Sequence, residues 1–255
     1  MISRIEAKLT RISQAVFFFL VWTLKFLVFS PFLKIRVEGK SNIPIRGRYI
    51  LAANHQNFFD GFFLAYPTGP LKNVRFVIAK RALKLKSYRL LAVLIGSVLI
   101  GSETEEYQRA LKRLNKILTH GSCIGIFPEG DVSSRKVPRR FKGGVAKLSL
   151  DSKTKVIPVY IHGTYNLRYF KYWLSRPEIL IKIGKPVDLY NYAKDGNNLE
   201  QMAAILREKI IDLMDVKEIK EFERIKEFTN SNSFDKTLTV KAYNLEQRES
   251  IIEAL

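Results

Sequence analysis

The sequence is poor in cysteine and histidine. Cys123 is its single cysteine, which excludes an internal disulfide and a cysteine-rich metal site. A chain of 255 residues that is 47% hydrophobic and has no disulfide framework is typical of a folded intracellular protein. The histidines, His55, His120 and His162, lack the spacing of metal ligands, so we expect neither a metal site nor a bound cofactor.

Sequence signatures of several common enzyme classes are also missing. There is no P-loop and no dinucleotide-binding glycine pattern, which argues against the enzyme classes that depend on them. No Gly-x-Ser-x-Gly motif occurs, and Cys123 falls in an apolar stretch, so the chain offers no recognisable serine or cysteine nucleophile. If the protein catalyses a transfer reaction, the nucleophile should come from the substrate.

Acidic residues are absent from a long internal stretch. Between Asp60 and Glu103 there is no aspartate or glutamate, whereas residues 72–89 contain seven lysines and arginines. The whole chain carries +19, and because residues 215–255 carry −2, the first 214 residues carry +21. Such a field attracts phosphates on lipid headgroups, nucleic acid or a small molecule, and it is equally compatible with a solvated basic face.

Residues 15–33 form an almost unbroken apolar run with basic residues on both sides. Its length is near the lower limit for a spanning helix, but Lys25 falls in its middle, where a charge is costly. No small-residue cleavage site follows, so we expect residues 1–33 to be retained as an apolar, membrane-associating helical segment. A buried core helix is the alternative, and whether the segment spans the bilayer or lies in one leaflet stays open.

After this segment, short apolar stretches alternate with helical patterns. Strands are predicted at 49–53, 74–79, 123–127, 156–162 and 179–183, and helices at 105–119, 145–150 and 199–214. This alternation predicts a single layered α/β domain over residues 34–214, with a mostly parallel or mixed sheet flanked by helices. The mixed-charge residues 215–255 are predicted to form a charged helical C-terminal appendage.

A histidine and an aspartate, His55 and Asp60, follow the first of these strands. On one continuous helix, positions five apart point about 140° away from each other and cannot pair. If His55 lies in the turn and Asp60 in the first turn of the next helix, the carboxylate can accept from one ring nitrogen and leave the other free as a base. The alternative is a purely structural role, in which the pair only satisfies the hydrogen bonds of the turn.

A glutamate follows a later strand, in the sequence Ile-Phe-Pro-Glu-Gly at residues 126–130. A basic loop comes next, with Arg135 and Lys142 ahead of Gly143 and Gly144. A carboxylate at a strand exit can bind a hydroxyl while the basic loop holds a phosphate. Two glycines before a helix also allow the backbone to approach an anion closely.

Three motifs in this order resemble those of the glycerolipid acyltransferase superfamily, nearest to the bacterial 1-acylglycerol-3-phosphate acyltransferases. They are His-x4-Asp at 55–60, Phe-Pro-Glu-Gly at 127–130 and Val-Ile-Pro-Val at 156–159. The resemblance implies that His55 is the general base and that Asp60 is its partner. It also implies substrate-binding roles for residues that match other family blocks: Lys80, Glu129, Gly130 and Pro158.

Two arginines that the family customarily has are missing from this chain. One family block commonly closes on Arg where the chain reads Gly-Ser-Glu at 101–103, and another continues Thr-Arg-Ser where the chain reads Asp-Val-Ser at 131–133. In the family these arginines are thought to contact the phosphate of the acceptor. Arg135, Lys142 or Lys80 would then replace them, or the acceptor carries a different headgroup.

The predicted function is transfer of a fatty acyl group to the free hydroxyl of a lysophospholipid. The preferred acceptor is 1-acyl-sn-glycerol-3-phosphate, and a different lysolipid is the alternative. The expected co-substrate is acyl-CoA or acyl carrier protein, both acidic and suited to the basic region. A lysolipid acceptor lies in the bilayer, so we expect peripheral or monotopic attachment to the cytoplasmic face of the cell membrane, with a phospholipid membrane and no nucleic acid as partner. A non-enzymatic basic protein that binds nucleic acid or anionic membrane is the alternative, and it leaves the three motifs unexplained.

Overall fold

The computed structural model describes residues 31–69, 74–83, 97–133, 138–193, 198–215 and 218–220, with Phe19, Thr23, Ala92 and Gly196. The chain divides into two compact units, Met1–Leu213 and Met214–Leu255. Most of the predicted appendage at 215–255 lies outside the described residues, and so does most of the predicted membrane-associating segment at 1–33; both stay predictions. Within the ranges given, no helix is both long and apolar enough to cross a membrane.

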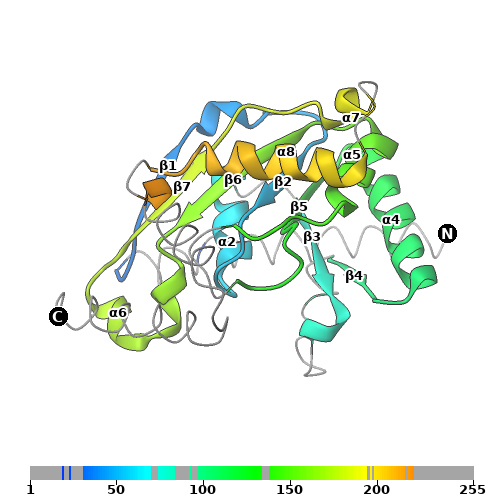
Figure 1. The fold of residues 1–255 in the computed structure, drawn as a ribbon. Helices are drawn as coiled ribbons and strands as arrows, with labels where there is room; N and C mark the ends of the chain where they lie inside the picture. The colour runs from blue at the N-terminus through cyan, green and yellow to red at the C-terminus, as the bar shows by residue number, and fades with distance from the viewer. Residues whose placement is uncertain are drawn as a thin grey trace, which may run out of the picture. The chain divides into compact units, whose positions relative to one another are not determined.

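In the first unit, the described strands form one seven-stranded sheet in the order β1-β7-β6-β2-β5-β3-β4 (Figure 1). The neighbours from β6 to β4 are parallel, β7 is antiparallel to β6, and β1 is parallel to β7. The mixed α/β sheet predicted from the sequence is therefore confirmed. The strands are β1 (Lys34–Glu38), β2 (Ile50–Ala53), β3 (Val74–Ala79), β4 (Val98–Ile100), β5 (Cys123–Ile126), β6 (Val156–His162) and β7 (Glu178–Ile183).

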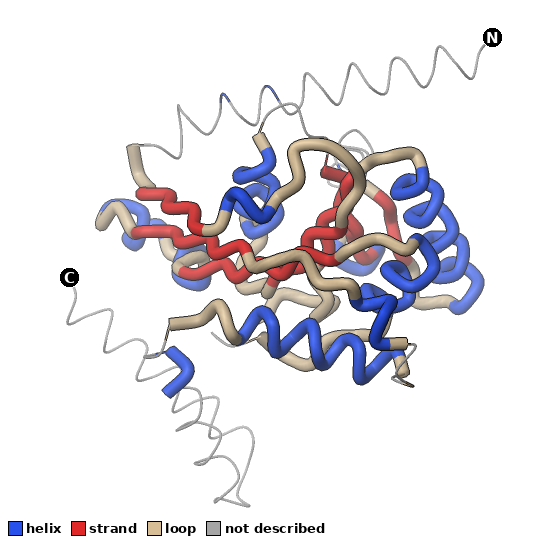
Figure 2. Tube along the Cα trace, turned by 90° about the horizontal axis from the view of Figure 1, so that it is seen from above, coloured by secondary structure: helices blue, strands red, loops and turns tan. Residues whose placement is uncertain are grey.

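Helices lie on both sides of this sheet (Figure 2). The α-helices are α2 (Asp60–Ala65), α4 (Thr104–Thr119), α5 (Gly144–Ser152), α6 (Phe170–Leu174), α7 (Leu189–Tyr192) and α8 (Leu199–Ile211). Short 3-10 turns connect several elements: η2 (Lys40–Asn42), η3 (Tyr66–Thr68), η4 (Lys80–Ala82) and η5 (Tyr165–Arg168).

One face of the sheet carries the larger apolar core. Alternate residues of β2, β6 and β7 point into it, because successive side chains of a strand face opposite sides. Phe63 and Leu64 of α2 are fully buried against these strand residues, and Tyr172 and Trp173 of α6 pack on the same cluster. This core therefore joins the helix that follows β2 to the segment that follows β6.

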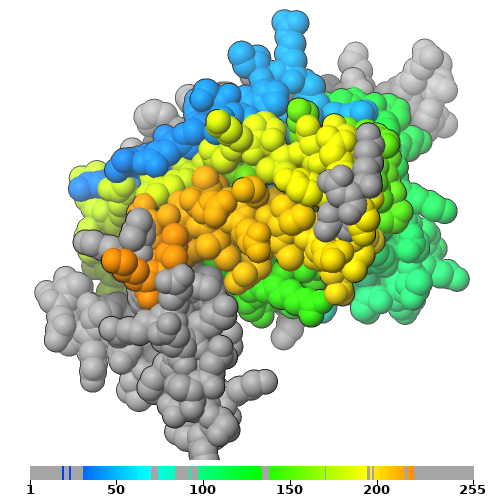
Figure 3. All heavy atoms as spheres, turned by 45° about the horizontal axis from the view of Figure 1, so that its top comes forward, coloured from blue at the N-terminus to red at the C-terminus, as the bar shows by residue number. Residues whose placement is uncertain are grey.

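The other face is covered by α8, which packs on β6 and α5, while α4 packs on α5 and the β4 edge. In the space-filling view of Figure 3, the yellow and orange atoms of α7 and α8 cover this face. Helix α8 begins at a capping box made by Asn198 and Gln201. It buries residues at helical spacing: Met202, Ala203, Leu206 and Ile210.

The five strands and three helices predicted from apolar patterns are all present, with ends that differ by three residues or fewer. The strands β1 and β4 were not predicted, and they are the two edges of the sheet. An edge strand has one pairing neighbour and is partly exposed, so its apolar pattern is weak. In β1 the sequence Lys-Ile-Arg-Val-Glu buries no residue fully, and β4 has only three residues.

Candidate active site

His55 and Asp60 pair across the turn between β2 and α2. Asp60 is the first residue of α2 and is fully buried. Its Oδ2 lies 3.0 Å from His55 Nδ1 and also accepts from the backbone N–H groups of Gln56 (2.5 Å) and Asn57 (2.7 Å). The predicted geometry, histidine in the turn and aspartate in the first helical turn, is confirmed. An Nδ1–H donated to Asp60 leaves the lone pair on Nε2 of the imidazole.

The backbone and ring of His55 are held by the Phe-Pro-Glu-Gly loop that follows β5. The His55 N–H donates to Glu129 Oε1 at 2.9 Å, and its C=O accepts from the Ser133 N–H at 2.6 Å. The imidazole stacks on the Phe127 ring, with 4.0 Å between centroids and 15° between planes. The His55 side chain remains 18% exposed, so the ring is fixed in place while one edge stays accessible.

The residue before His55 attaches the turn to the neighbouring strand. The side-chain amide of Asn54 donates to the Ile161 C=O at 2.9 Å, and its carbonyl accepts from the Ile161 N–H at 2.8 Å. Because β2 and β6 are parallel neighbours, this two-way bond joins the carboxyl ends of both strands. The supports from Asn54, Phe127 and Ser133 were not predicted, since they depend on which strands are adjacent.

Glu129 has a different place from the one expected for an acceptor-binding residue. Its side chain is completely buried, and besides the His55 N–H it accepts from the Arg139 N–H at 3.1 Å and from Arg139 Nε at 3.4 Å. Burial raises the pKa of the Glu129 carboxyl, although the N–H donors of His55 and Arg139 and the Arg139 charge oppose the shift. The carboxylate therefore holds the turn that carries His55, and binding of an acceptor hydroxyl by Glu129 stays a prediction.

Gly130 takes a backbone conformation that favours glycine, with φ of +80°. The side chain of Lys142 passes over it, so a Cβ at this position would lie 2.6 Å from Lys142 Nζ. The Gly130 C=O accepts from the Arg81 guanidinium at 3.2 Å. The positive φ therefore favours glycine at this position, and two cationic side chains, Lys142 and Arg81, lie against its backbone.

Arg81 and Asp131 form a two-pronged ion pair beside Gly130. Arg81 NH2 lies 2.5 Å from Asp131 Oδ2, and Arg81 Nε lies 3.2 Å from Asp131 Oδ1. Both side chains are more than half exposed. Arg139 NH2 also donates to the Asp131 C=O at 2.9 Å, which brings a second guanidinium to the same loop.

The three cations predicted to replace the family arginines have different surroundings, and their role stays a prediction. Lys80 Nζ is paired with Glu106, and this bond lowers the pKa of the Glu106 carboxyl. Arg135 lies outside the described residues. Lys142 lies at Gly130, and among the described residues it has no ion-pair partner. Arg81 and Arg139 also reach this loop, and neither was predicted from the sequence.

Gly143 and Gly144 serve helix packing in this structure. A Cβ on Gly143 would lie 3.1 Å from Leu199 Cβ, and one on Gly144 would lie 2.8 Å from the Tyr107 hydroxyl. The two glycines therefore let α5 approach α8 and α4 closely. Close approach of their backbone to an anion stays a prediction.

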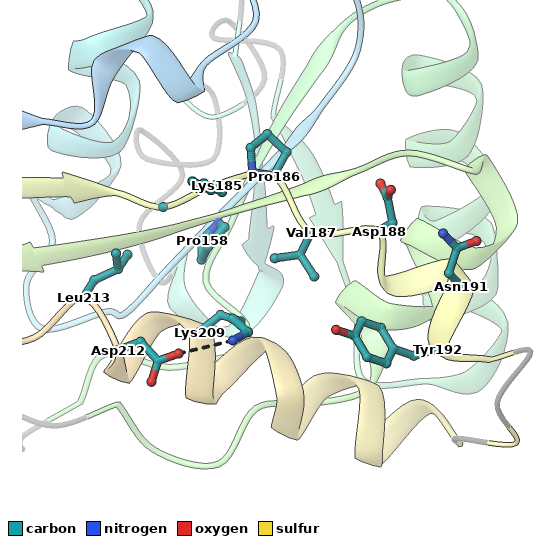
Figure 4. A pocket seen from close by; sticks show the side chains of 11 residues that line it. Pro158, Lys185, Pro186, Val187, Asp188, Asn191, Tyr192, Lys209, Asp212 and Leu213 are labelled. Carbon is teal, nitrogen blue, oxygen red and sulfur yellow. Dashed lines mark hydrogen bonds and ion pairs between the residues drawn. The ribbon is translucent and has the colours of Figure 1, made fainter.

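Pro158 lies in the middle of β6, in register with Ala52 of β2, and is buried. It lines a cavity of about 530 Å³ between the Gly184–Asp188 strand exit and the end of α8 (Figure 4). No residue of the His55 turn lines this cavity. A Cβ on Gly184 would lie 2.8 Å from Pro158 Cγ, so Pro158 shapes the packing on the α8 side of the sheet.

The other two histidines differ in their surroundings. His120 is the C-cap of α4, where its Nδ1 lies 2.7 Å from the Lys116 C=O. His162 ends β6 and is exposed. Within the described ranges, no group of three or more His, Cys, Asp or Glu side chains is placed to hold a metal ion.

A family model, Acyltransferase, matches residues 34–162, which is half of the chain and contains all the predicted site residues. The chain belongs to the acyltransferase family. The protein is therefore an enzyme, and its catalytic class is transfer of acyl groups. The two motifs that suggested the family, His-x4-Asp and Phe-Pro-Glu-Gly, fall in the matched range together with the His55 site.

Curated relatives of this acyltransferase are named 1-acyl-sn-glycerol-3-phosphate acyltransferase. The protein from Borreliella burgdorferi is 26% identical over 184 residues, covering 70% of this chain and 71% of the relative. The protein from Bacillus subtilis is 24% identical over 187 residues, covering 70% and 87%. The crystal structure of the 1-acyl-sn-glycerophosphate acyltransferase PlsC from Thermotoga maritima has the same fold, with a TM-score of 0.59 at 23% identity over 77% of this chain and 79% of that one.

Proposed function

We propose that this acyltransferase moves a fatty acyl group from acyl-CoA or acyl carrier protein to the free hydroxyl of 1-acyl-sn-glycerol-3-phosphate, giving phosphatidate. The observation that carries the proposal is the His55–Asp60 pair, with a 3.0 Å bond at Nδ1 and a partly accessible ring. The names of the curated relatives support the acceptor.

In this reaction His55 Nε2 removes the proton of the acceptor hydroxyl as its oxygen attacks the thioester carbonyl. Asp60 accepts from Nδ1–H and stabilises the imidazolium that forms, while the bonds to Gln56 and Asn57 hold the carboxylate in place. When the tetrahedral intermediate collapses, the thiolate leaves and takes the proton back from His55. General-base assistance of this kind contributes about 10²–10⁴ in rate.

The phosphate of the acceptor would bind at the Gly130 loop. Arg81, Arg139 and Lys142 all reach this loop, and Glu129 connects it to His55. Guanidinium groups bind phosphate oxygens in pairs, so two arginines from other positions can provide the donors that the missing family arginines would give. The acceptor hydroxyl would then lie at His55 while the headgroup stays at the exposed cations.

A second acceptor class is supported by Asp131. This exposed carboxylate stands where the family customarily has threonine, and it is paired with Arg81. A headgroup that carries an amine as well as a phosphate could bind Asp131 with the amine and the cations with the phosphate. Such a lysolipid would use the same chemistry at His55.

Membrane attachment completes the proposal. The acceptor partitions into the bilayer, and the apolar residues 15–33 and the basic residues 72–89 suit a peripheral or monotopic protein on the cytoplasmic face of the cell membrane. The reaction as written needs the acyl donor as co-substrate and no further cofactor.

The test is transfer of a labelled acyl group by the purified full-length protein. Acyl-CoA and acyl carrier protein serve as donors, and the acceptors are lysophosphatidate and lysolipids with amine-bearing headgroups. We expect His55→Ala to reduce transfer about 10²–10⁴-fold, and His162→Ala, an exposed histidine at the end of β6, to leave it unchanged. Full activity of His55→Ala would contradict the mechanism, and transfer only to an amine-bearing lysolipid would favour the second acceptor class.

A further inference from the structure

The segment between β6 and β7 has an unusual composition. Residues 165–176 contain five aromatic and three basic residues and no acidic residue. Aromatic rings together with Lys and Arg are typical of protein surfaces at the boundary between membrane and water. The segment comes after the range that the family model matches, so the acyltransferase motifs do not account for it.

Part of this segment is anchored and part faces outward. Tyr165 and Leu167 are buried, and the Trp173 Nε1–H donates to the Leu167 C=O at 2.7 Å. Tyr169 and Leu174 are exposed, Leu174 to 63%. The three basic side chains are also exposed: Arg168, Lys171 and Arg176. A fixed turn therefore presents apolar and cationic side chains to the outside.

The segment lies beside the His55 turn. Phe59 of that turn packs edge-on against Trp173, with 5.6 Å between ring centroids. The neighbouring Phe58 is 74% exposed. Because β2 and β6 are parallel neighbours, the residues that follow them emerge at the same edge of the sheet.

The start of β1 reaches this edge as well. Lys34 is in register with Glu178 at the start of β7, and its N–H donates to the Pro177 C=O at 3.0 Å. Phe32, just before β1, is exposed. Figure 1 shows α6 and the beginning of β1 at the lower left of the sheet, where the chain enters from residues 1–33.

Exposed large apolar side chains are concentrated at this edge. Six large apolar side chains are exposed among the described residues of 31–215, and five of them lie in segments that reach this edge. The sixth, Ile45, lies before the opposite end of β2. The five are Phe32, Phe58, Val132, Tyr169 and Leu174. Such clustering marks an interaction surface, whereas exposed apolar residues scattered singly need no explanation.

We propose that a membrane-contact surface, the aromatic rim, consists of Phe32, Phe58, Tyr169, Lys171 and Leu174 and rests on an anionic bilayer beside His55. The apolar side chains enter the interfacial layer, and Arg168, Lys171 and Arg176 bind the anionic headgroups. Each basic residue near an anionic surface strengthens binding about fivefold. The cations alone would suit an acidic protein such as acyl carrier protein. Aromatic and basic side chains exposed together are typical of the boundary between membrane and water, so the membrane is the better match.

The aromatic rim deepens the proposed function and rests on it for its purpose. A lysolipid exposes its free hydroxyl at the headgroup layer of the bilayer. A rim that includes Phe58, three residues from His55, would bring the base to that layer without removing the acceptor from the membrane. The contact itself is testable without any measurement of acyl transfer.

The first experiment locates the membrane on the full-length protein. Leu174→Cys and, as matched control, Ile45→Cys are labelled with an environment-sensitive dye; Cys123 is buried and stays unlabelled. With vesicles containing phosphatidylglycerol, we expect the emission at position 174 to shift to the blue and rise about twofold or more, and that at position 45 to stay unchanged. Vesicle binding with no response at position 174, or a response there only to acyl carrier protein, would overturn the proposal.

The second experiment measures what the aromatic rim contributes. The double variant Lys171→Glu with Leu174→Asp should partition onto these vesicles about tenfold less than the wild-type protein, and Ile45→Asp should partition equally. Transfer to a bilayer-embedded lysolipid should fall in parallel, whereas transfer to a short-chain acceptor below its micelle concentration should not. Equal partitioning of the double variant would contradict the proposal. If no acceptor is acylated but the dye at position 174 responds, the proposed function fails and the aromatic rim stands.

Discussion

The His55 turn and the Gly130 loop lie next to each other but are built in opposite ways. His55 is held by a ring nitrogen bond, two backbone bonds and a stacked ring, and its partners Asp60 and Glu129 are buried. The cations at the Gly130 loop are exposed: Arg81 pairs with an exposed carboxylate, and Lys142 has no ion-pair partner among the described residues. Glu129 is the connection between the two regions.

This difference separates the chemistry from the recognition of the acceptor. Buried groups that accept several hydrogen bonds, as Asp60 Oδ2 and the Glu129 carboxylate do, keep one geometry, because breaking those bonds in the interior is costly. Exposed ion pairs contribute little to stability and exchange readily with water or a ligand. The acyl-transfer machinery is therefore sensitive to single substitutions, and the headgroup region can change without loss of the fold.

The largest effect should come from the buried side of this comparison. Asp60→Asn removes the charge that stabilises the imidazolium and places an amide where Oδ2 accepts three hydrogen bonds. We expect kcat to fall about 10³-fold. The matched control Asp131→Asn, at an exposed carboxylate, should change kcat less than about threefold. Similar losses in both variants would mean that the two regions are not distinct.

Glu129→Gln should have the next largest effect. A glutamine has one acceptor oxygen, so it cannot accept from both His55 and Arg139 in the way the carboxylate does. We expect kcat to fall about 10- to 100-fold, with a smaller change in KM. Glu106→Gln, which alters only the pair with Lys80, is the control and should retain activity.

The same variant should change the pH dependence of stability. The pKa of Glu129 is raised in the folded protein, chiefly by burial, so the folded state holds this proton more tightly than the unfolded state. The wild-type protein therefore loses free energy of unfolding as pH rises from the ordinary glutamate pKa through the raised value. Glu129→Gln lacks this titration. As pH rises over that window, the Tm of the variant should therefore increase relative to the Tm of the wild-type protein. A difference that is constant with pH would contradict the assignment.

A moderate effect is expected at the Arg81–Asp131 pair. Arg81→Ala should raise KM for lysophosphatidate about three- to tenfold, and Asp131→Ala should lower it by freeing the guanidinium. Arg140→Ala, which breaks the exposed pair with Glu200, is the control. If Asp131→Ala instead raises KM for an amine-bearing lysolipid, Asp131 binds the headgroup and the second acceptor class is favoured.

The smallest effect should come from Lys80, which the family resemblance assigns to substrate binding. Its Nζ is paired with Glu106 on the exposed surface. Lys80→Ala should change KM and kcat less than about threefold and Tm only slightly, because an exposed ion pair contributes little to stability. A loss above about tenfold would show that Lys80 leaves Glu106 to bind the substrate.

The sequence predicted the interior of the fold better than its edges. Central strands such as β6 are apolar on both faces, and that pattern needs no knowledge of neighbours. The edge strands β1 and β4 are short or alternate with charged residues, and only pairing with β7 and β3 identifies them as strands. The His55–Asp60 bond was predictable because five residues of chain and a strand-to-helix turn determine it locally.

Tertiary contacts around the predicted site residues could not be predicted. The neighbouring strand brings the His55 N–H to the Glu129 carboxylate. Helix α8 packs against Gly143 through Leu199. The burial of a carboxylate or the closeness of a helix depends on strand order and layer packing, which a one-dimensional pattern does not record.

By itself, the sequence determined the mixed α/β class, the histidine and aspartate at one turn and the acyltransferase motifs, because residue type and short spacing specify local structure. The tertiary structure decided which groups support His55, which cations reach Gly130, and that the segment at 165–176 lies beside Phe58 and Phe59. Several of these contacts join residues 50 to more than 100 positions apart, as in Arg81 with Asp131 and Asn54 with Ile161. Only the order of strands in the sheet brings such residues together.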